Sequence, residues 1–326
     1  MALKASRMDA QTKVAGTSET VTESVVTLVQ NLIDYAGLFP PTALAMPAAV
    51  ASYDKYLRSE FGWMLGRFVV QASRLGEFQT AVAQLPSSST GQTQRWDLSA
   101  LVGPDVTGDF ARVSEFNSHS NSKGAPIRSK IESVEVKVTS PAEIEKFSRI
   151  ICPDMETYFE IPCITATPEN MRECVRTVAA CGRRAKIRTG GETADKIPPV
   201  EIVIDFMQAC ATAKVPFKAT AGLHHPVRSM HRLTYQPDSP SGMMHGFLNV
   251  FLAVAFVRTG IDTPLAVALV NEQSPEAFEF DSSGVLWQDQ RLSIAQIAEA
   301  RRDFAISFGS CSFTEPIEDL QSLHLL

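Results

Sequence analysis

The chain has 326 residues, 44% of them hydrophobic and 20% charged, which suits a globular protein with one large α/β domain or two smaller ones. Its formal net charge of −6 argues against a general binder of nucleic acid or membrane surfaces, because such proteins carry a basic surplus. The polar first residues contain no hydrophobic signal core, and the apolar run 246–257 is shorter than the roughly 20 residues that cross a bilayer. We therefore expect a cytoplasmic protein.

The cysteines lie in apolar stretches and form no Cys-x-x-Cys pair. This pattern favours reduced thiols in the core over disulfides or a zinc cage. The six residues are Cys152, Cys163, Cys174, Cys181, Cys210 and Cys311.

The order of the predicted elements indicates a barrel. Residues 1–22 are rich in Ser and Thr and lack periodicity, so we expect a loose N-terminal arm there. Short apolar segments bounded by Gly, Pro or Ser then alternate with helical patterns and predict strands at 31–34, 67–71, 95–102, 131–138, 158–161, 185–189, 216–220 and 305–308. Eight strands mostly separated by helices predict a single α/β domain over residues 23–326, folded as a closed (β/α)8 TIM barrel.

Helix starts are well marked in the middle of the chain. Ser140-Pro141 followed by Glu143 has the spacing of a capping box, and Thr167-Pro168 offers a second N-cap before a helix that stops at Gly182. Between 199 and 214, apolar residues recur on one helical face.

The stretch between the seventh and eighth predicted strands is too long for one ordinary βα unit. This insertion, about 226–300, contains an apolar helix near 244–257 and a hairpin at 278–287 with Ser-Gly at its turn. We expect it to cover the mouth of the barrel as a lid or to form a contact between subunits of a homo-oligomer.

Two lysines lie in similar segments 32 positions apart (218 − 186), Lys186 in Ala-Lys-Ile-Arg-Thr-Gly-Gly and Lys218 in Phe-Lys-Ala-Thr-Ala-Gly. That spacing is about one strand-plus-helix unit, so we expect both side chains in one pocket at the ends of neighbouring parallel strands. A lysine is a nucleophile only as the free amine, which burial and a second nearby cation both favour. The pair predicts Schiff-base chemistry on a carbonyl substrate.

These motifs, Lys-x-x-Thr-Gly, Phe-Lys-x-x-x-Gly and a terminal Phe-Gly-x-x-Ser, resemble those of the deoxyribose-phosphate aldolase family, class I aldolases built as (β/α)8 barrels. Asp34, Glu135 and Glu160 are similar to acidic residues on the family's first, fourth and fifth strands. The resemblance implies that Lys186 forms the Schiff base, that Lys218 lowers its pKa, and that Glu135 relays protons.

The resemblance also implies a substrate-binding role for residues that follow the strands. In the family, backbone amides and a hydroxyl hold the substrate phosphate. The positions here that match or adjoin them are Thr189, Gly190, Gly191, Gly222, Gly309, Ser310 and Ser312. Arg188 and the pair His224-His225 depart from the family pattern, which weakens the phosphate cradle on one side and adds a guanidinium. We therefore expect a small carbonyl substrate with an anionic group, a sugar phosphate or an oxo acid, that Asp34 and Glu160 also contact.

Two alternatives stay open. His224, His225 and His245, with Glu160 or Glu135, would form a metal site for a lyase or hydrolase. The second alternative is a barrel that binds a ligand without turnover. Independently of these, Glu135 and Glu160 could serve only as structural ion-pair partners of Lys186 and Lys218, because buried charges must be paired. The preferred interpretation is a lyase that needs no cofactor, acts on a small molecule, and has neither nucleic acid nor membrane as a partner.

Overall fold

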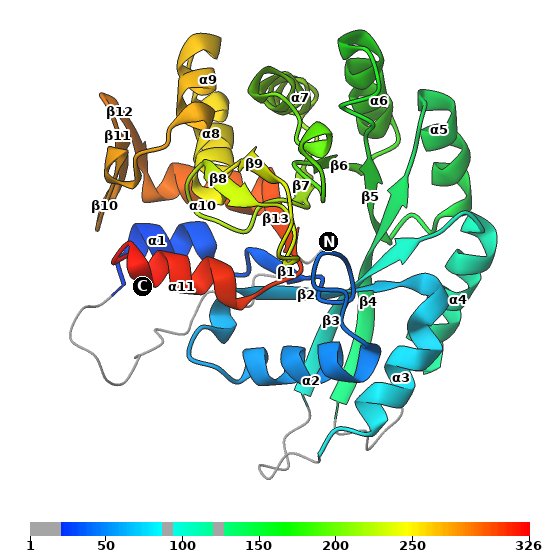
Figure 1. Ribbon diagram of the computed structural model, residues 1–326. Coiled ribbons are helices and arrows are strands. Elements are labelled where there is room, and N and C mark those ends of the chain that lie inside the picture. Colours follow the sequence, from blue (N-terminus) through cyan, green and yellow to red (C-terminus); the bar gives the residue numbers. More distant parts are fainter. Residues whose placement is uncertain (1–20, 87–93, 120–126) are drawn as a thin grey trace.

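The computed structural model describes residues 21–86, 94–119 and 127–326, and its centre is a closed barrel of eight parallel strands (Figure 1). The strands are β1 (Ile33–Tyr35), β2 (Leu65–Gln71), β3 (Gln94–Val102), β4 (Ile127–Lys137), β5 (Glu156–Glu160), β6 (Arg184–Arg188), β7 (Phe217–Thr220) and β13 (Ala305–Ser310). β13 pairs with both β7 and β1 and closes the barrel. Each segment predicted as a strand forms one of these eight, so the prediction of a (β/α)8 barrel is confirmed.

Helices surround the barrel strands (Figure 1). They are α1 (Glu23–Val29), α2 (Met46–Leu57), α3 (Leu75–Ala83), α4 (Val106–His119), α5 (Pro141–Ile150), α6 (Pro168–Ala180), α7 (Val200–Ala213), α8 (Phe247–Thr259), α9 (Thr263–Asn271), α10 (Ile294–Asp303) and α11 (Thr314–Ser322). Within the described ranges, none of them combines the length and the apolar character needed to cross a membrane. Residues 1–20 of the predicted N-terminal arm lie outside the described residues.

The predicted helix caps are present. The Ser140 hydroxyl accepts a hydrogen bond from the Glu143 amide at the start of α5, and Thr167 caps α6 through the Asn170 amide. α7 buries the apolar face that its periodicity predicts, which consists of Val203, Phe206, Met207 and Cys210.

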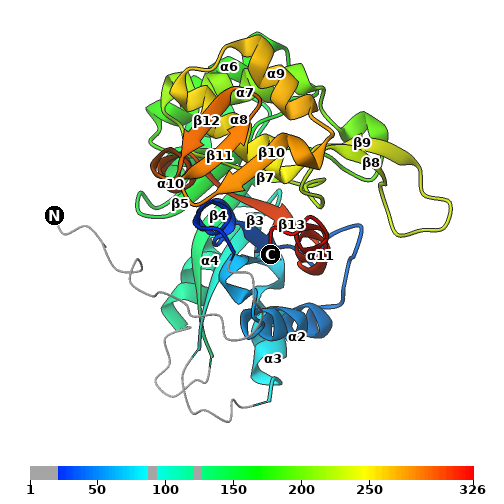
Figure 2. The same cartoon turned by 90° about the vertical axis from the view of Figure 1, so that its left-hand side faces the viewer.

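The segment between β7 and β13 divides into three parts. β8 (Ser229–Arg232) and β9 (Ser241–Met244) form an antiparallel pair that extends away from the barrel (Figure 2). α8 and α9 pack against each other and against α7. β10 (Phe278–Asp281), β11 (Gly284–Trp287) and β12 (Gln290–Ser293) form a small sheet that contacts α1 and α10.

The predicted hairpin at 278–287 is present, but two of its details differ from the prediction. Asp281 pairs with Gly284, so Ser282 and Ser283 form the turn in place of Ser-Gly. β12 adds a third strand that was not predicted.

The centre of the barrel is polar, whereas aliphatic side chains fill most (β/α)8 barrels. Toward the amino ends of the strands, Arg67 and Arg184 both pair with Glu156. Nearer the carboxyl ends, ion pairs connect Asp34, Glu135, Glu160, Lys186 and Lys218. Because buried charges are stable only when they are paired, this arrangement links the fold of the barrel directly to its candidate site.

Candidate active site

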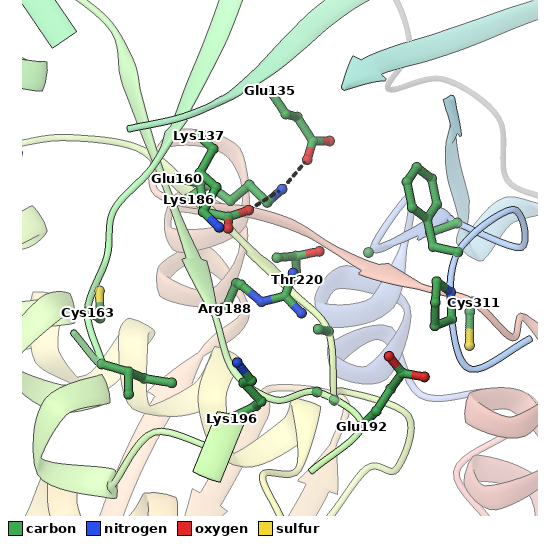
Figure 3. A pocket seen from close by; sticks show the side chains of 18 of the residues that line it. Glu135, Lys137, Glu160, Cys163, Lys186, Arg188, Glu192, Lys196, Thr220 and Cys311 are labelled. Carbon is green, nitrogen blue, oxygen red and sulfur yellow. Dashed lines mark ion pairs between the residues drawn. The ribbon is translucent and has the colours of Figure 1, made fainter. Parts of the chain in front are cut away.

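A cavity of about 640 Å³ lies at the carboxyl ends of the barrel strands. It is lined at one end by Glu135, Glu160 and Lys186, and Figure 3 shows Lys186 paired with both carboxylates. Arg188 points into the same space (Figure 3). Active sites of (β/α)8 enzymes lie at this end of the barrel.

The two predicted lysines are neighbours in this cavity. Lys186 on β6 and Lys218 on β7 are register partners, and both side chains line the cavity floor. Lys186 Nζ lies 2.7 Å from Glu135 Oε2 and 2.8 Å from Glu160 Oε2. Lys218 Nζ lies 2.7 Å from Glu135 Oε1 and 2.6 Å from Asp34 Oδ2. One carboxylate, Glu135, therefore bridges the two amines.

Buried serines hold these carboxylates in place. The Ser99 hydroxyl donates to Glu135 Oε1 at 2.7 Å, and the Ser133 hydroxyl donates to Ser99 Oγ at 2.9 Å. Asp34 accepts from the Ser307 hydroxyl at 2.8 Å. These serines are not among the predicted site residues, although each occupies an inward-facing position of a predicted strand.

The pKa of Lys186 is raised, whereas the sequence predicts that burial and a second cation lower it. Burial alone would lower the pKa of Lys186, but the charges and hydrogen bonds of Glu135 and Glu160 outweigh burial and raise it above its ordinary value. Lys218 is likewise buried, and Asp34 and Glu135 raise its pKa. The resting site therefore holds two ammonium groups, because each Nζ lies within 2.8 Å of two carboxylate oxygens.

The pKa values of Glu135 and Glu160 shift in the opposite direction. Burial alone would raise the pKa of Glu135, but Lys186 and Lys218 outweigh it and hold the pKa well below its usual range. For Glu160, burial is likewise outweighed, by Lys186 and then Arg188, and the pKa is lowered. Ion pairs thus join three carboxylates to the two lysines in one network, which consists of Asp34, Glu135, Glu160, Lys186 and Lys218.

Further cations line the cavity beyond this network. Lys137, Arg188 and Lys196 all border it, together with the acidic residues Glu192 and Asp195. In the described part of the chain, no ion pair joins these three cations to a carboxylate. The cavity therefore offers positive charge to an anionic ligand close to Lys186.

Three predicted substrate contacts do not line the cavity and instead support the frame of the site. Asp34 is held by Lys218 and Ser307. The Thr189 hydroxyl donates to the Ala221 carbonyl at 2.6 Å. Gly190 packs against Gly222, where an added Cβ would lie 2.8 Å from the facing Cα.

Of the remaining predicted loop residues, some line the cavity and others support its frame. Gly191, Gly222 and Gly309 line the cavity. Ser310 and Ser312 do not, because the Ser310 hydroxyl accepts from the Ser312 amide and the Ser312 hydroxyl accepts from the Glu315 amide at the start of α11. The two serines thus stabilise the turn into the helix.

The histidines do not converge on one point. His224 lines the cavity, whereas the ring of His225 lies 2.6 Å from Asp319 Oδ2 and stacks on His231. His245 lies between the Pro198 carbonyl and Arg228, and burial lowers its pKa to about 4. No group of three or more His, Cys, Asp or Glu side chains within the described ranges is placed to hold a metal ion. The three histidines therefore do not form the metal site considered from the sequence.

Comparison with protein-family models, with curated proteins and with solved structures yields no match. The resemblance to the deoxyribose-phosphate aldolase family thus rests on the sequence motifs alone. The functional argument depends on the barrel and on the geometry of its lysine pair.

Proposed function

We propose that the protein is a class I lyase of the aldolase type, which forms a Schiff base between Lys186 and a small carbonyl substrate that carries an anionic group. The observation that carries the proposal is the position of Lys186. It is buried, yet it lines a cavity at the carboxyl end of a (β/α)8 barrel and has a second lysine as its register partner. A buried, paired lysine in such a cavity is a candidate covalent nucleophile.

The resting ammonium must pass a proton to a neighbour before it attacks a carbonyl. Glu135 and Glu160 lie within hydrogen-bond distance of Nζ and are the acceptors for that proton. Attack on the carbonyl carbon gives a carbinolamine, and loss of water with return of the proton gives an iminium ion. The net reaction converts an ammonium ion and a carbonyl group into an iminium ion and water, so the charge of the site does not change.

The same carboxylates would therefore stabilise the intermediate. The iminium nitrogen takes the place of the ammonium between Glu135 and Glu160, in a buried region where charge interactions are strong. Glu135 also contacts Lys218, so it is placed to take a proton from the substrate carbon next to the iminium and share it with the second lysine.

The charge at the cavity mouth supports an anionic substrate. Arg188 can bind a carboxylate or phosphate through two parallel hydrogen bonds, and Lys137 adds a second positive charge. A cavity of about 640 Å³ suits a small molecule. We therefore propose an oxo acid or a sugar phosphate as the substrate class.

Turnover of a panel of aldehydes, 2-oxo acids and sugar phosphates tests the proposal, with the wild type, Lys186→Ala and chelator-treated enzyme compared. We expect activity in the wild type and after exhaustive chelation, and none in Lys186→Ala. Activity that survives in Lys186→Ala would contradict the proposal, as would activity that chelation removes and a metal restores. Binding of a panel compound without turnover in the wild type would favour the non-catalytic barrel.

A further inference from the structure

A cysteine, a histidine and a glutamate form a connected set at the same cavity, on the side opposite Cys163 (Figure 3). Cys311 follows β13, and its Sγ lies 3.8 Å from His224 Nε2. His224 follows β7, and its Nδ1 lies 2.8 Å from Glu315 Oε2 in the first turn of α11. Cys311 and His224 both line the cavity. The Schiff-base mechanism uses none of the three side chains.

The contacts orient the histidine. Glu315 holds Nδ1, so Nε2 faces the thiol, and the other Glu315 oxygen accepts a hydrogen bond from the Tyr235 hydroxyl at 3.0 Å. A nucleophile beside a base that a third group orients is the arrangement that covalent catalysis by cysteine requires.

The pKa values of Cys311 and His224 both shift against the effect of burial. Burial alone would raise the pKa of the Cys311 thiol, but contact with His224 outweighs it and lowers the pKa below its usual value. Burial alone would lower the pKa of His224, but Cys311 and Glu315 outweigh it and raise the pKa to about 9. Both shifts favour a thiolate on Cys311 beside an imidazolium on His224.

Another cysteine in the cavity provides an internal comparison. Cys163 also lines the cavity, but burial raises its pKa strongly and no histidine contacts it in the described part of the chain. A thiol is nucleophilic as the thiolate, so the two cysteines face the same space with different reactivity. The sequence predicts both only as reduced core thiols.

We propose that Cys311 is a second covalent nucleophile of this cavity, activated by His224 and oriented through Glu315, which accepts the acyl group of a small ester or thioester. The thiolate attacks the acyl carbon, a carbon–sulfur bond forms, and the bond to the leaving group breaks. The imidazolium of His224 gives its Nε2 proton to that leaving group. Water then attacks the thioester and gives a proton to His224, and Cys311 leaves as the thiolate. This releases the acid and restores the ion pair.

The reactivity of the thiol can be measured first. The full-length protein is treated with iodoacetamide near pH 7, and alkylation of each cysteine is followed by peptide mass spectrometry. We expect Cys311 to react roughly ten times faster than the exposed Cys152, because contact with His224 favours the thiolate of Cys311 and the thiolate is the reactive form. We expect Cys163 to stay unmodified. A rate at Cys311 no faster than at Cys152 would overturn the proposal.

Acyl transfer is tested with p-nitrophenyl acetate, followed by an acid quench and peptide mapping. We expect an acetyl thioester on Cys311 in the wild type, and an acylation rate lower by roughly 100-fold in His224→Gln, the loss typical of a missing general base or acid. Glu315→Gln keeps the shape of the side chain and should show a smaller loss. Cys152→Ser is the matched cysteine control and should acylate as the wild type does.

Acylation of Cys311 does not depend on the Schiff-base proposal, because Cys311 should still be acylated in Lys186→Ala. Thermal unfolding of each variant shows whether a loss of acylation reflects a loss of fold. Acetyl groups found only on lysines, or unchanged p-nitrophenol release in both Cys311→Ser and His224→Gln, would refute the role of Cys311.

Discussion

Lys186 and Lys218 are register partners on adjacent strands, and each places its Nζ 2.7 Å from a different oxygen of Glu135. The carboxylate between them cancels much of the repulsion that a bare pair of lysines would produce. The pKa of Lys186 is therefore raised, not lowered. The free amine of Lys186 therefore forms by proton transfer to a neighbouring carboxylate, and the pKa of Lys186 sets the pH at which this transfer limits turnover.

Lys218→Leu should shift the pH dependence of turnover to higher pH. Glu135 would then pair with Lys186 alone, so the pKa of Lys186 would rise further and the free amine would form at higher pH. The variant should also lose roughly 3–5 kcal/mol of unfolding free energy, because Asp34 stays buried without its cation. Urea unfolding and a pH–rate profile check the two effects, and an unchanged profile would count against the coupling of the lysines.

Glu160→Gln should shift the same profile in the opposite direction. It removes one of the two carboxylates that hold the Lys186 ammonium and keeps the size of the side chain. The pKa of Lys186 then falls, and the rising limb of the pH–rate profile moves to lower pH. A shift to higher pH would show that Glu160 acts mainly as a proton acceptor whose loss is limiting.

Arg188→Gln should raise KM for an anionic carbonyl substrate by roughly 10- to 100-fold, the range expected for one lost hydrogen-bonded charge pair. The value of kcat should change much less, because in the described part of the chain no ion pair joins Arg188 to Glu135 or Glu160, the two carboxylates that contact Nζ of Lys186. Arg149→Gln is the matched control, since Arg149 lies on α5 away from this cavity and pairs with Glu145. Equal KM values for the two variants would contradict the proposed anion site.

The ionised network should confine the stability of the protein to a window of pH. The lowered pKa values of Glu135 and Glu160 contribute stability that is present above about pH 4.3, the ordinary value for glutamate, and is lost as pH falls toward the folded values. The raised pKa values of Lys186 and Lys218 contribute stability that is present below about pH 10.4 and is lost as pH rises through the folded values. Urea midpoints across pH 3–11 should show a plateau with a fall on each side, and Glu160→Gln should weaken the acid fall.

Much of the fold could be predicted because its determinants are local. Most barrel strands contain apolar residues between turn residues, and the caps at Ser140 and Thr167 depend on residues three positions apart. The spacing of Lys186 and Lys218 placed them on adjacent strands because one βα unit separates them. The small sheet was only partly predicted. β12 has four residues without a strand pattern of their own, and it forms a strand because it pairs with β11.

The site was predicted less well, mainly because strand alternation was not applied to the residues near strand ends. Successive side chains of a strand face opposite sides, so Lys186 and Arg188 point inward while Thr189 points outward. The same alternation on β13 places Gly309 at the cavity and turns Ser310 away from it.

Other features could not be read from the sequence at all. The contact between Cys311 and His224 joins residues 87 positions apart, and it depends on where two loops meet. The bridging role of Glu135 likewise depends on the packing of three strands. Long-range packing, not local pattern, decides both.

Borohydride trapping tests the central claim most directly. The wild-type protein is incubated with each carbonyl compound of the panel, reduced, digested and mapped by mass spectrometry, with Lys186→Ala as the control. We predict a reduced adduct on the peptide that contains Lys186, with at least one anionic carbonyl compound, and no adduct in Lys186→Ala. An adduct on Lys218 or on surface lysines alone, or no adduct with a compound that the protein turns over, would contradict the account.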